Sequence, residues 1–108
     1  FVVDEAYYEY VAPLPDATAL PLLSQSVNQH ENLLVTRTFS KAWGMAGVRL
    51  GFVAGSARLI DLMKRVRSPY SVNALAVYVA ERMLPKSQEV LAAAQEAMQR
   101  KQRLIDAF

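Results

Sequence analysis

Cysteine is absent from the sequence, which excludes disulfide bonds and metal sites built on thiolates. No uninterrupted apolar run is long enough to cross a bilayer, and the amino terminus has neither the basic region nor the apolar core of a signal peptide. An excess of one charge is also missing, because twelve lysines and arginines stand against ten aspartates and glutamates. We therefore expect no membrane partner and no nucleic-acid partner, and a reducing compartment fits these absences.

Apolar residues, by contrast, are plentiful. They make up 53% of the 108 residues, and charged residues make up 20%, which is typical of a globular domain and not of a disordered tail. The chain opens without methionine on the apolar residues 1–3 and stops inside a helical pattern at residues 104–108. Because natural domains more often begin and end in polar segments, we expect a piece of a longer protein.

Three runs of apolar and branched residues predict β-strands, at residues 1–3, 33–38 and 49–55. The first run is continuously apolar, so we expect a buried strand whose carboxyl end exposes Asp4. Prolines mark residues 11–21 as a loop. Strands that precede a set of helices indicate an α/β fold.

The second half of the sequence predicts three helices. Ser56 can cap the first, which Pro69 ends, and Ser71 can cap the second, which Pro85 closes. Ser87 can cap a third helix that runs to the end of the chain, about 30 Å long at 1.5 Å per residue. A helix of that length predicts a connector to another domain.

Two segments carry residues suited to chemistry. The first is residues 4–7, at the end of the first predicted strand, and the second is residues 38–41, at the end of the next strand, followed by Arg49. Ligands of open α/β sheets bind beyond the carboxyl ends of strands. If the two strands are near neighbours, both segments belong to one pocket.

The side chains of these segments match the needs of one cofactor. Asp4 can pair with a cationic ring nitrogen, and Tyr7 can donate to an oxygen. Lys41 can act as a nucleophile or form a Schiff base. A phosphate can be bound by hydroxyl and guanidinium groups, here those of Thr38, Ser40 and Arg49. Together these are the needs of pyridoxal phosphate.

Both segments also look like the cofactor motifs of fold-type I aminotransferases. Residues 40–42 read Ser-Lys-Ala, and residues 46–52 read Ala-Gly-x-Arg-x-Gly-Phe. This pair of motifs, in this order and spacing, most resembles the histidinol-phosphate aminotransferase branch.

The resemblance assigns a role to each matching residue. Lys41 would be the catalytic residue, bound to the cofactor as a Schiff base and later shuttling a proton. The cofactor-binding residues would be Asp4 at the ring nitrogen, Tyr7 at the phenolic oxygen, and Thr38, Ser40 and Arg49 at the phosphate. Residues 68–73 resemble a segment near the substrate, which makes Asn73 a candidate substrate contact. No metal ligands are implied.

The resemblance also implies an architecture and an activity. We expect part of a fold-type I large domain, with a mixed, mostly parallel sheet and helices, in which residues 1–86 form the carboxy-terminal half of the cofactor-binding domain. Residues 87–108 would lead to a small domain. The parent would be a cytoplasmic homodimer that moves an amino group between histidinol phosphate, the amino donor, and 2-oxoglutarate, a 2-oxo acid, in histidine biosynthesis.

Other interpretations stay open at this point. A threonine-phosphate decarboxylase of the same branch would share every motif, and an aminotransferase-like sensor domain of a transcription regulator resembles the pattern more distantly. The isolated chain would be inactive in any case, and its truncated sheet would expose an edge that invites self-association.

Several residues are assigned structural roles. His30 lies in a polar connection and is expected at the surface, and the basic cluster of residues 64–67 is expected on a solvated helix face. Tyr8 is expected to pack or to line a substrate channel. Trp43 fits equally well as a pocket residue and as a buried loop residue.

Overall fold

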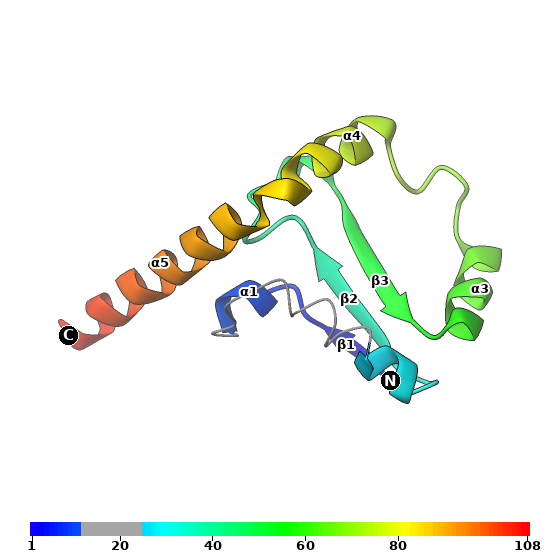
Figure 1. The fold of residues 1–108 in the computed structure, drawn as a ribbon, viewed down its shortest axis with the longest axis horizontal. Helices are drawn as coiled ribbons and strands as arrows, with labels where there is room; N and C mark the ends of the chain where they lie inside the picture. The colour runs from blue at the N-terminus through cyan, green and yellow to red at the C-terminus, as the bar shows by residue number, and fades with distance from the viewer. Residues whose placement is uncertain (12–24) are drawn as a thin grey trace.

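The computed structural model describes residues 1–11 and 25–108. Within them a three-stranded sheet has the order β1 (Val2–Asp4), β2 (Leu34–Thr38) and β3 (Gly51–Gly55), as Figure 1 shows. The predicted strands are confirmed to within two residues at each end. The loop predicted at residues 11–21 falls almost entirely outside the described residues.

The sheet is mixed. β1 and β2 run parallel, whereas β2 and β3 run antiparallel. The resemblance implied a mostly parallel sheet, but in the described residues one strand pair is parallel and the other is antiparallel. The reason lies in the connection between β2 and β3, which holds only the short helix η1 (Ala46–Val48) and no crossover helix of the kind that parallel strands need.

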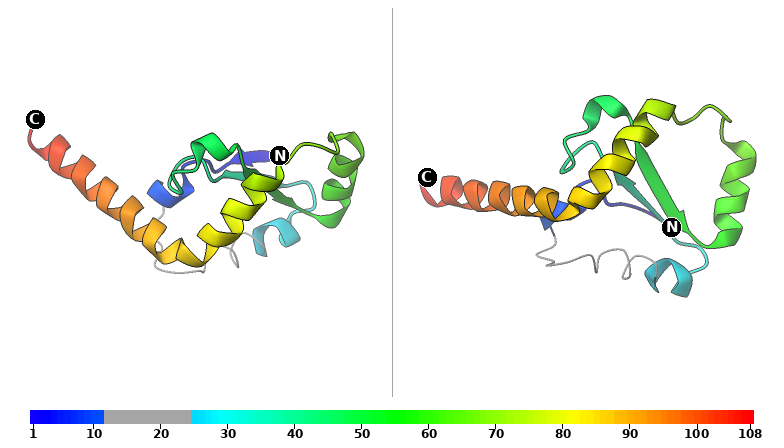
Figure 2. Two further views of the ribbon diagram at one scale, coloured as in Figure 1. Left: turned by 90° about the horizontal axis from the view of Figure 1, so that it is seen from above. Right: turned by 45° about the horizontal axis from the view of Figure 1, so that its top comes forward.

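Helices occupy the remainder of the described chain. Residues 25–29 are helical, and α3 follows β3 directly. The chain then runs through α4 and the short helix η2 into α5, which projects away from the sheet (Figures 1 and 2). The bounds are α1 (Tyr8–Val11), α3 (Ala57–Val66), α4 (Ala74–Met83), η2 (Leu84–Lys86) and α5 (Ser87–Asp106).

The long terminal helix is confirmed and has 20 residues. It lies against α1 and buries Val90 and Ala94, while its distal end is exposed. With this projection the longest axis of the molecule reaches 51 Å. Across the described ranges, none of the helices combines the length and the apolar character needed to cross a membrane.

Buried apolar side chains form two small clusters. Val27, from the helical residues 25–29, packs with Val35 of β2, and Phe39, Met45 and Ala80 join the loop after β2 to helix α4. The second cluster matters for function, because it packs the chain between residues 39 and 50 onto α4. The positions of the residues in that loop are thus determined by packing.

The expectation of a buried first strand is wrong. Val2 is 68% exposed and Val3 43% exposed, because in the described part of the chain β1 pairs only with β2 and has an uncovered edge. A continuous apolar run indicates a strand that can be buried on both faces, but it does not supply the neighbours that would bury it.

The predicted helix caps also need correction. Ser56 precedes α3, but its hydroxyl donates to the carbonyl oxygen of Glu31 at 2.9 Å and makes no cap bond. Ser71 lies too early, since α4 is capped by Asn73, whose Oδ1 accepts from the amide of Ala76 at 3.0 Å. Ser87 is already inside α5, because η2 carries the chain into that helix without an interruption.

The observed cap gives a direct prediction. Replacing Asn73 with alanine should lower the free energy of unfolding by about 1 kcal/mol, because the Ala76 amide loses its acceptor. Ser71→Ala is the matched control and should change that free energy by only a few tenths of a kcal/mol. Urea unfolding of the variants would measure both, and equal losses would contradict the assigned cap.

Candidate active site

The two motif segments meet at one edge of the sheet. β1 and β2 are adjacent and parallel, with Asp4 in register with Thr36. The carboxyl ends of these strands therefore point the same way, and residues 4–7 and 38–41 follow them at the same edge. The condition that the sequence left open, that the two strands are neighbours, is met.

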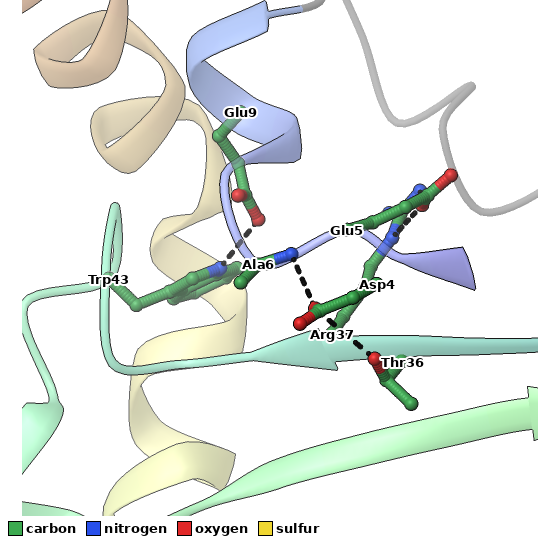
Figure 3. A network of polar contacts seen from close by, with 7 residues as sticks. All are labelled: Asp4, Glu5, Ala6, Glu9, Thr36, Arg37 and Trp43. Atoms are coloured by element: carbon green, nitrogen blue, oxygen red, sulfur yellow. Dashed lines mark hydrogen bonds and ion pairs between the residues drawn. The ribbon is translucent and has the colours of Figure 1, made fainter. Parts of the chain in front are cut away.

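Asp4 is held at the end of β1 by two hydrogen bonds. Its Oδ1 accepts from the amide of Ala6 at 3.1 Å and from the hydroxyl of Thr36 at 3.2 Å, as drawn in Figure 3. Among the described residues no group donates to Oδ2, and the side chain is exposed. One carboxylate oxygen is thus occupied and the other is free to accept from a ligand.

Tyr7 and Lys41 lie next to each other, although they come from different motifs. The Nζ atom of Lys41 is 5.0 Å from the centroid of the Tyr7 ring, within the range of a cation–π contact. Both side chains are exposed, Tyr7 by 56%. A primary amine and a phenol therefore share one open region beside the sheet.

The hydroxyls of Thr38 and Ser40 form a pair. Their oxygen atoms are 2.9 Å apart, and the amide of Ser40 donates to the Thr38 hydroxyl at 3.1 Å. The backbone here is anchored by the residue just before β3, because the amide of Phe39 donates to the carbonyl oxygen of Leu50 at 3.1 Å. Both hydroxyls therefore have defined positions.

Arg49 immediately precedes Leu50, whose carbonyl oxygen accepts from the amide of Phe39. Its backbone is left-handed, with φ of 59°, a conformation that is uncommon outside glycine. Its guanidinium donates to the carbonyl oxygen of Ala46 at 3.1 Å, so the side chain folds back over η1. Backbone conformations of this kind are concentrated at functional sites, which favours a binding role.

A second set of contacts, missed in the sequence, braces the segment that carries Asp4 and Tyr7. Glu5 forms an ion pair with Arg37, at 2.7 and 2.8 Å from two guanidinium nitrogens. Arg37 also lies 3.8 Å from the centroid of the Tyr8 ring, so Tyr8 is a packing residue. The sequence did contain a signal for this contact. Side chains alternate between the two faces along a strand, which places Arg37 on the opposite face from Thr36.

Trp43 makes another such connection. Its indole nitrogen donates to Glu9 at 3.3 Å (Figure 3), and its ring meets Phe39 edge-on at 5.3 Å. The side chain is half-buried, which favours the structural interpretation over the pocket one. The loop that carries Lys41 is thereby tied to α1.

Asn73 uses its side-chain hydrogen bond to cap α4. That bond does not connect it to the other candidate site residues. His30 is exposed, as expected, and residues 64–67 lie exposed across the end of α3. In the part of the chain that the structure covers, no group of acidic residues and histidine could hold a metal ion.

The resulting donor set fits the polar parts of pyridoxal phosphate. A free carboxylate oxygen suits a protonated ring nitrogen, a phenol suits a ring oxygen, and an amine suits an aldehyde carbon. Two paired hydroxyls and an arginine suit phosphate oxygens. These groups come from the segments after β1 and β2 and from the residues just before β3.

A family model matches the whole chain, and curated relatives match most of it. A family model described as aminotransferase class I and II matches residues 1–108. Histidinol-phosphate aminotransferase 1 of Thiobacillus denitrificans is 47% identical over 77% of this chain and 21% of its own length. Histidinol-phosphate aminotransferase of Erythrobacter litoralis is 49% identical over 68% of this chain and 19% of its own.

Two solved structures share the fold. A protein of Erwinia carotovora whose structure was described as that of a "putative histidinol-phosphate aminotransferase" superposes with a TM-score of 0.76 at 29% identity. The match covers 99% of this chain and 30% of that one. L-threonine-O-3-phosphate decarboxylase from Porphyromonas gingivalis superposes with a TM-score of 0.70 at 24% identity. That match covers 95% of this chain and 29% of the decarboxylase chain. The chain therefore spans about a fifth of the length of the curated relatives and less than a third of these solved chains.

Proposed function

Because the chain belongs to the class I and II aminotransferase family, we propose that it carries part of a pyridoxal-phosphate site in a histidinol-phosphate aminotransferase. Its mixed three-stranded sheet and long carboxy-terminal helix match part of fold-type I aminotransferase chains. The identity of 47–49% with histidinol-phosphate aminotransferases supports this branch.

The observation that carries the proposal is the meeting of Tyr7 and Lys41. The lysine amine lies 5.0 Å from the centroid of the tyrosine ring, and Asp4 lies on the strand next to the one that leads to Lys41. A pyridoxal-phosphate site needs these groups close together, and neither motif alone contains all of them. Most exposed lysines have no such neighbours, so the proximity distinguishes Lys41 from the other lysines of the chain.

When bound, pyridoxal phosphate supplies an electron-accepting ring for reactions at the amino carbon of a substrate. Asp4 Oδ2 would hold the proton of the ring nitrogen, and Tyr7 would donate to the ring oxygen. Lys41 Nζ would hold the aldehyde carbon and, once released, would carry a proton as a general base. Thr38, Ser40 and Arg49 would bind the phosphate.

The substrates and the assembly are part of the same proposal. Histidinol phosphate would be the amino donor and 2-oxoglutarate the acceptor, in a homodimeric cytoplasmic parent. Residues 1–86 would belong to the cofactor-binding domain and residues 87–108 to the connector. Asn73 would contact the substrate through Nδ2, because its Oδ1 already caps α4.

Covalent labelling tests the cofactor site. The chain is mixed with pyridoxal phosphate and reduced with borohydride, and the modified lysine is identified by peptide mass spectrometry. We expect one adduct per chain on Lys41, lost in Lys41→Ala and retained in the control Lys64→Ala. Labelling scattered over Lys64, Lys86 and Lys101, or no labelling, would contradict a working site in this chain.

The substrate proposal needs a separate assay on the protein that contains the full site. Transfer of the amino group from histidinol phosphate to 2-oxoglutarate, measured as glutamate formed, would support it. Release of carbon dioxide from threonine phosphate without glutamate formation would instead indicate the decarboxylase, whose solved relative shares the fold with this chain.

A further inference from the structure

Thr36 is a residue of the sheet whose hydroxyl reaches the candidate site. It lies in the middle of β2, is half-buried, and is in register with Asp4. Register partners of neighbouring strands project to the same face of a sheet, so the two side chains meet there. The sequence motifs begin only at Thr38 and therefore leave Thr36 out.

We propose that Thr36 is a positioning residue for Asp4, an inference that rests on the proposed cofactor site. A carboxylate on a strand end can rotate about two side-chain bonds. The Ala6 amide and the Thr36 hydroxyl both donate to Oδ1, at 3.1 and 3.2 Å. One donor comes from the same segment and the other from the next strand, so together they hold the carboxylate in one orientation (Figure 3).

The orientation matters because it decides where the oxygen without a hydrogen bond lies. With both donors on Oδ1, Oδ2 is presented to the region beyond the strand ends, the place where ligands of α/β sheets bind. A carboxylate already oriented in the free protein loses less conformational entropy when it binds a ring nitrogen. Thr36 thus acts on the ligand through Asp4 and not by contact.

The backbone around Thr36 keeps its hydroxyl in reach of Asp4. The amide of Glu5 donates to the carbonyl oxygen of Thr36 at 2.9 Å. On the opposite face, the next pair along, Glu5 and Arg37, forms the ion pair described above. β1 is therefore held to β2 from both faces at the two positions next to the site.

Thr36→Val tests the proposal, because valine has nearly the same shape, favours strands and lacks only the hydroxyl. The first measurement needs no cofactor: NMR coupling constants report the side-chain rotamer of Asp4. We expect one rotamer in the natural chain and in Thr36→Ser, and an average of rotamers in Thr36→Val. Ser56→Ala, which removes a hydroxyl bond elsewhere in the structure, should leave the rotamer unchanged.

The second measurement is the dissociation constant of pyridoxal phosphate, followed by absorbance, with the ¹⁵N shift of its ring nitrogen. Loss of one hydrogen bond to an exposed carboxylate predicts binding that is weaker by roughly fivefold, with a shifted ring-nitrogen signal. Both effects should be reversed in Thr36→Ser. Urea unfolding should show that Thr36→Val is at least as stable as the natural chain, which separates positioning from folding.

The two proposals fail in different ways. Absence of a Lys41 adduct in the natural chain would overturn the cofactor site, and the Asp4 rotamer would then still decide whether Thr36 orients the carboxylate. A single Asp4 rotamer in Thr36→Val would overturn the positioning role. So would unchanged cofactor binding by that variant in a chain that labels at Lys41.

Discussion

Replacing Arg37 with alanine should lower the free energy of unfolding by about 2 kcal/mol, because removing one partner of a half-buried ion pair leaves the other charge without its hydrogen bonds. The Arg37 side chain is only 9% exposed, and that of Glu5 is 26% exposed. The same guanidinium covers the Tyr8 ring at 3.8 Å, so the substitution removes a cation–π contact as well. Urea unfolding of the chain would measure the loss.

The chain contains a matched control for this prediction. Arg100 and Glu96 form an ion pair at 2.6 Å on α5, with side chains 73% and 61% exposed. Pairs of this kind contribute only about 0–1 kcal/mol, so Arg100→Ala should have a small effect. Equal losses for the two alanine variants would contradict the structural importance of the Glu5–Arg37 pair.

Arg37→Lys separates charge from geometry. Lysine keeps the positive charge but cannot present two nitrogens to one carboxylate while stacking on a ring. We therefore expect it to recover only part of the stability. Arg37 holds Glu5 and Tyr8, which lie on either side of Tyr7 in the sequence. Labelling of Lys41 by pyridoxal phosphate should therefore fall in Arg37→Ala, and it should be unchanged in Arg100→Ala.

Replacing Gly51 with alanine should also be costly, at about 2 kcal/mol or more. Gly51 begins β3 opposite Thr38, and a Cβ atom there would lie 2.7 Å from the carbonyl oxygen of Arg37. That contact is with backbone, so the strands themselves would have to separate. Thr38 is the register partner, and the Thr38–Ser40 hydroxyl pair should move with it.

Gly47 provides the control for the glycine prediction. A Cβ atom at Gly47 meets nothing within 4 Å, so Gly47→Ala should leave stability nearly unchanged, although both glycines belong to the same motif. Urea unfolding would give the free energy of unfolding of each variant. Binding of inorganic phosphate would show whether the Thr38–Ser40 hydroxyl pair has moved. A Gly51→Ala variant as stable as Gly47→Ala would show that β2 and β3 can separate without loss.

The order of elements and the identity of the motif residues were predictable from the sequence. β2 begins one residue later than expected and β3 two residues later, and the long helix α5 is present. Apolar periodicity predicts such elements because it depends on residues only a few positions apart. The motif residues at 38–41 and 49 could be identified because their types and spacing stand in one continuous stretch.

Other features depended on neighbours that the local pattern does not contain. Val2 and Val3 look buried by composition but are exposed at an uncovered edge. The cap of α4 was predicted at Ser71 but is Asn73 in the structure, because the position of the first helical turn decides which residue caps the helix. Several serines and asparagines near a helix start are compatible with the same pattern.

The local sequence shows which residue types are available for chemistry, whereas the pairing of β1 with β2 brings particular residues together. Thr36 reaches Asp4 and Arg37 reaches Glu5 across 32 positions of sequence, through the parallel register of β1 and β2. A shift of that register by one residue would turn both side chains to the wrong faces. Such contacts follow from strand pairing, which no local spacing in the sequence specifies.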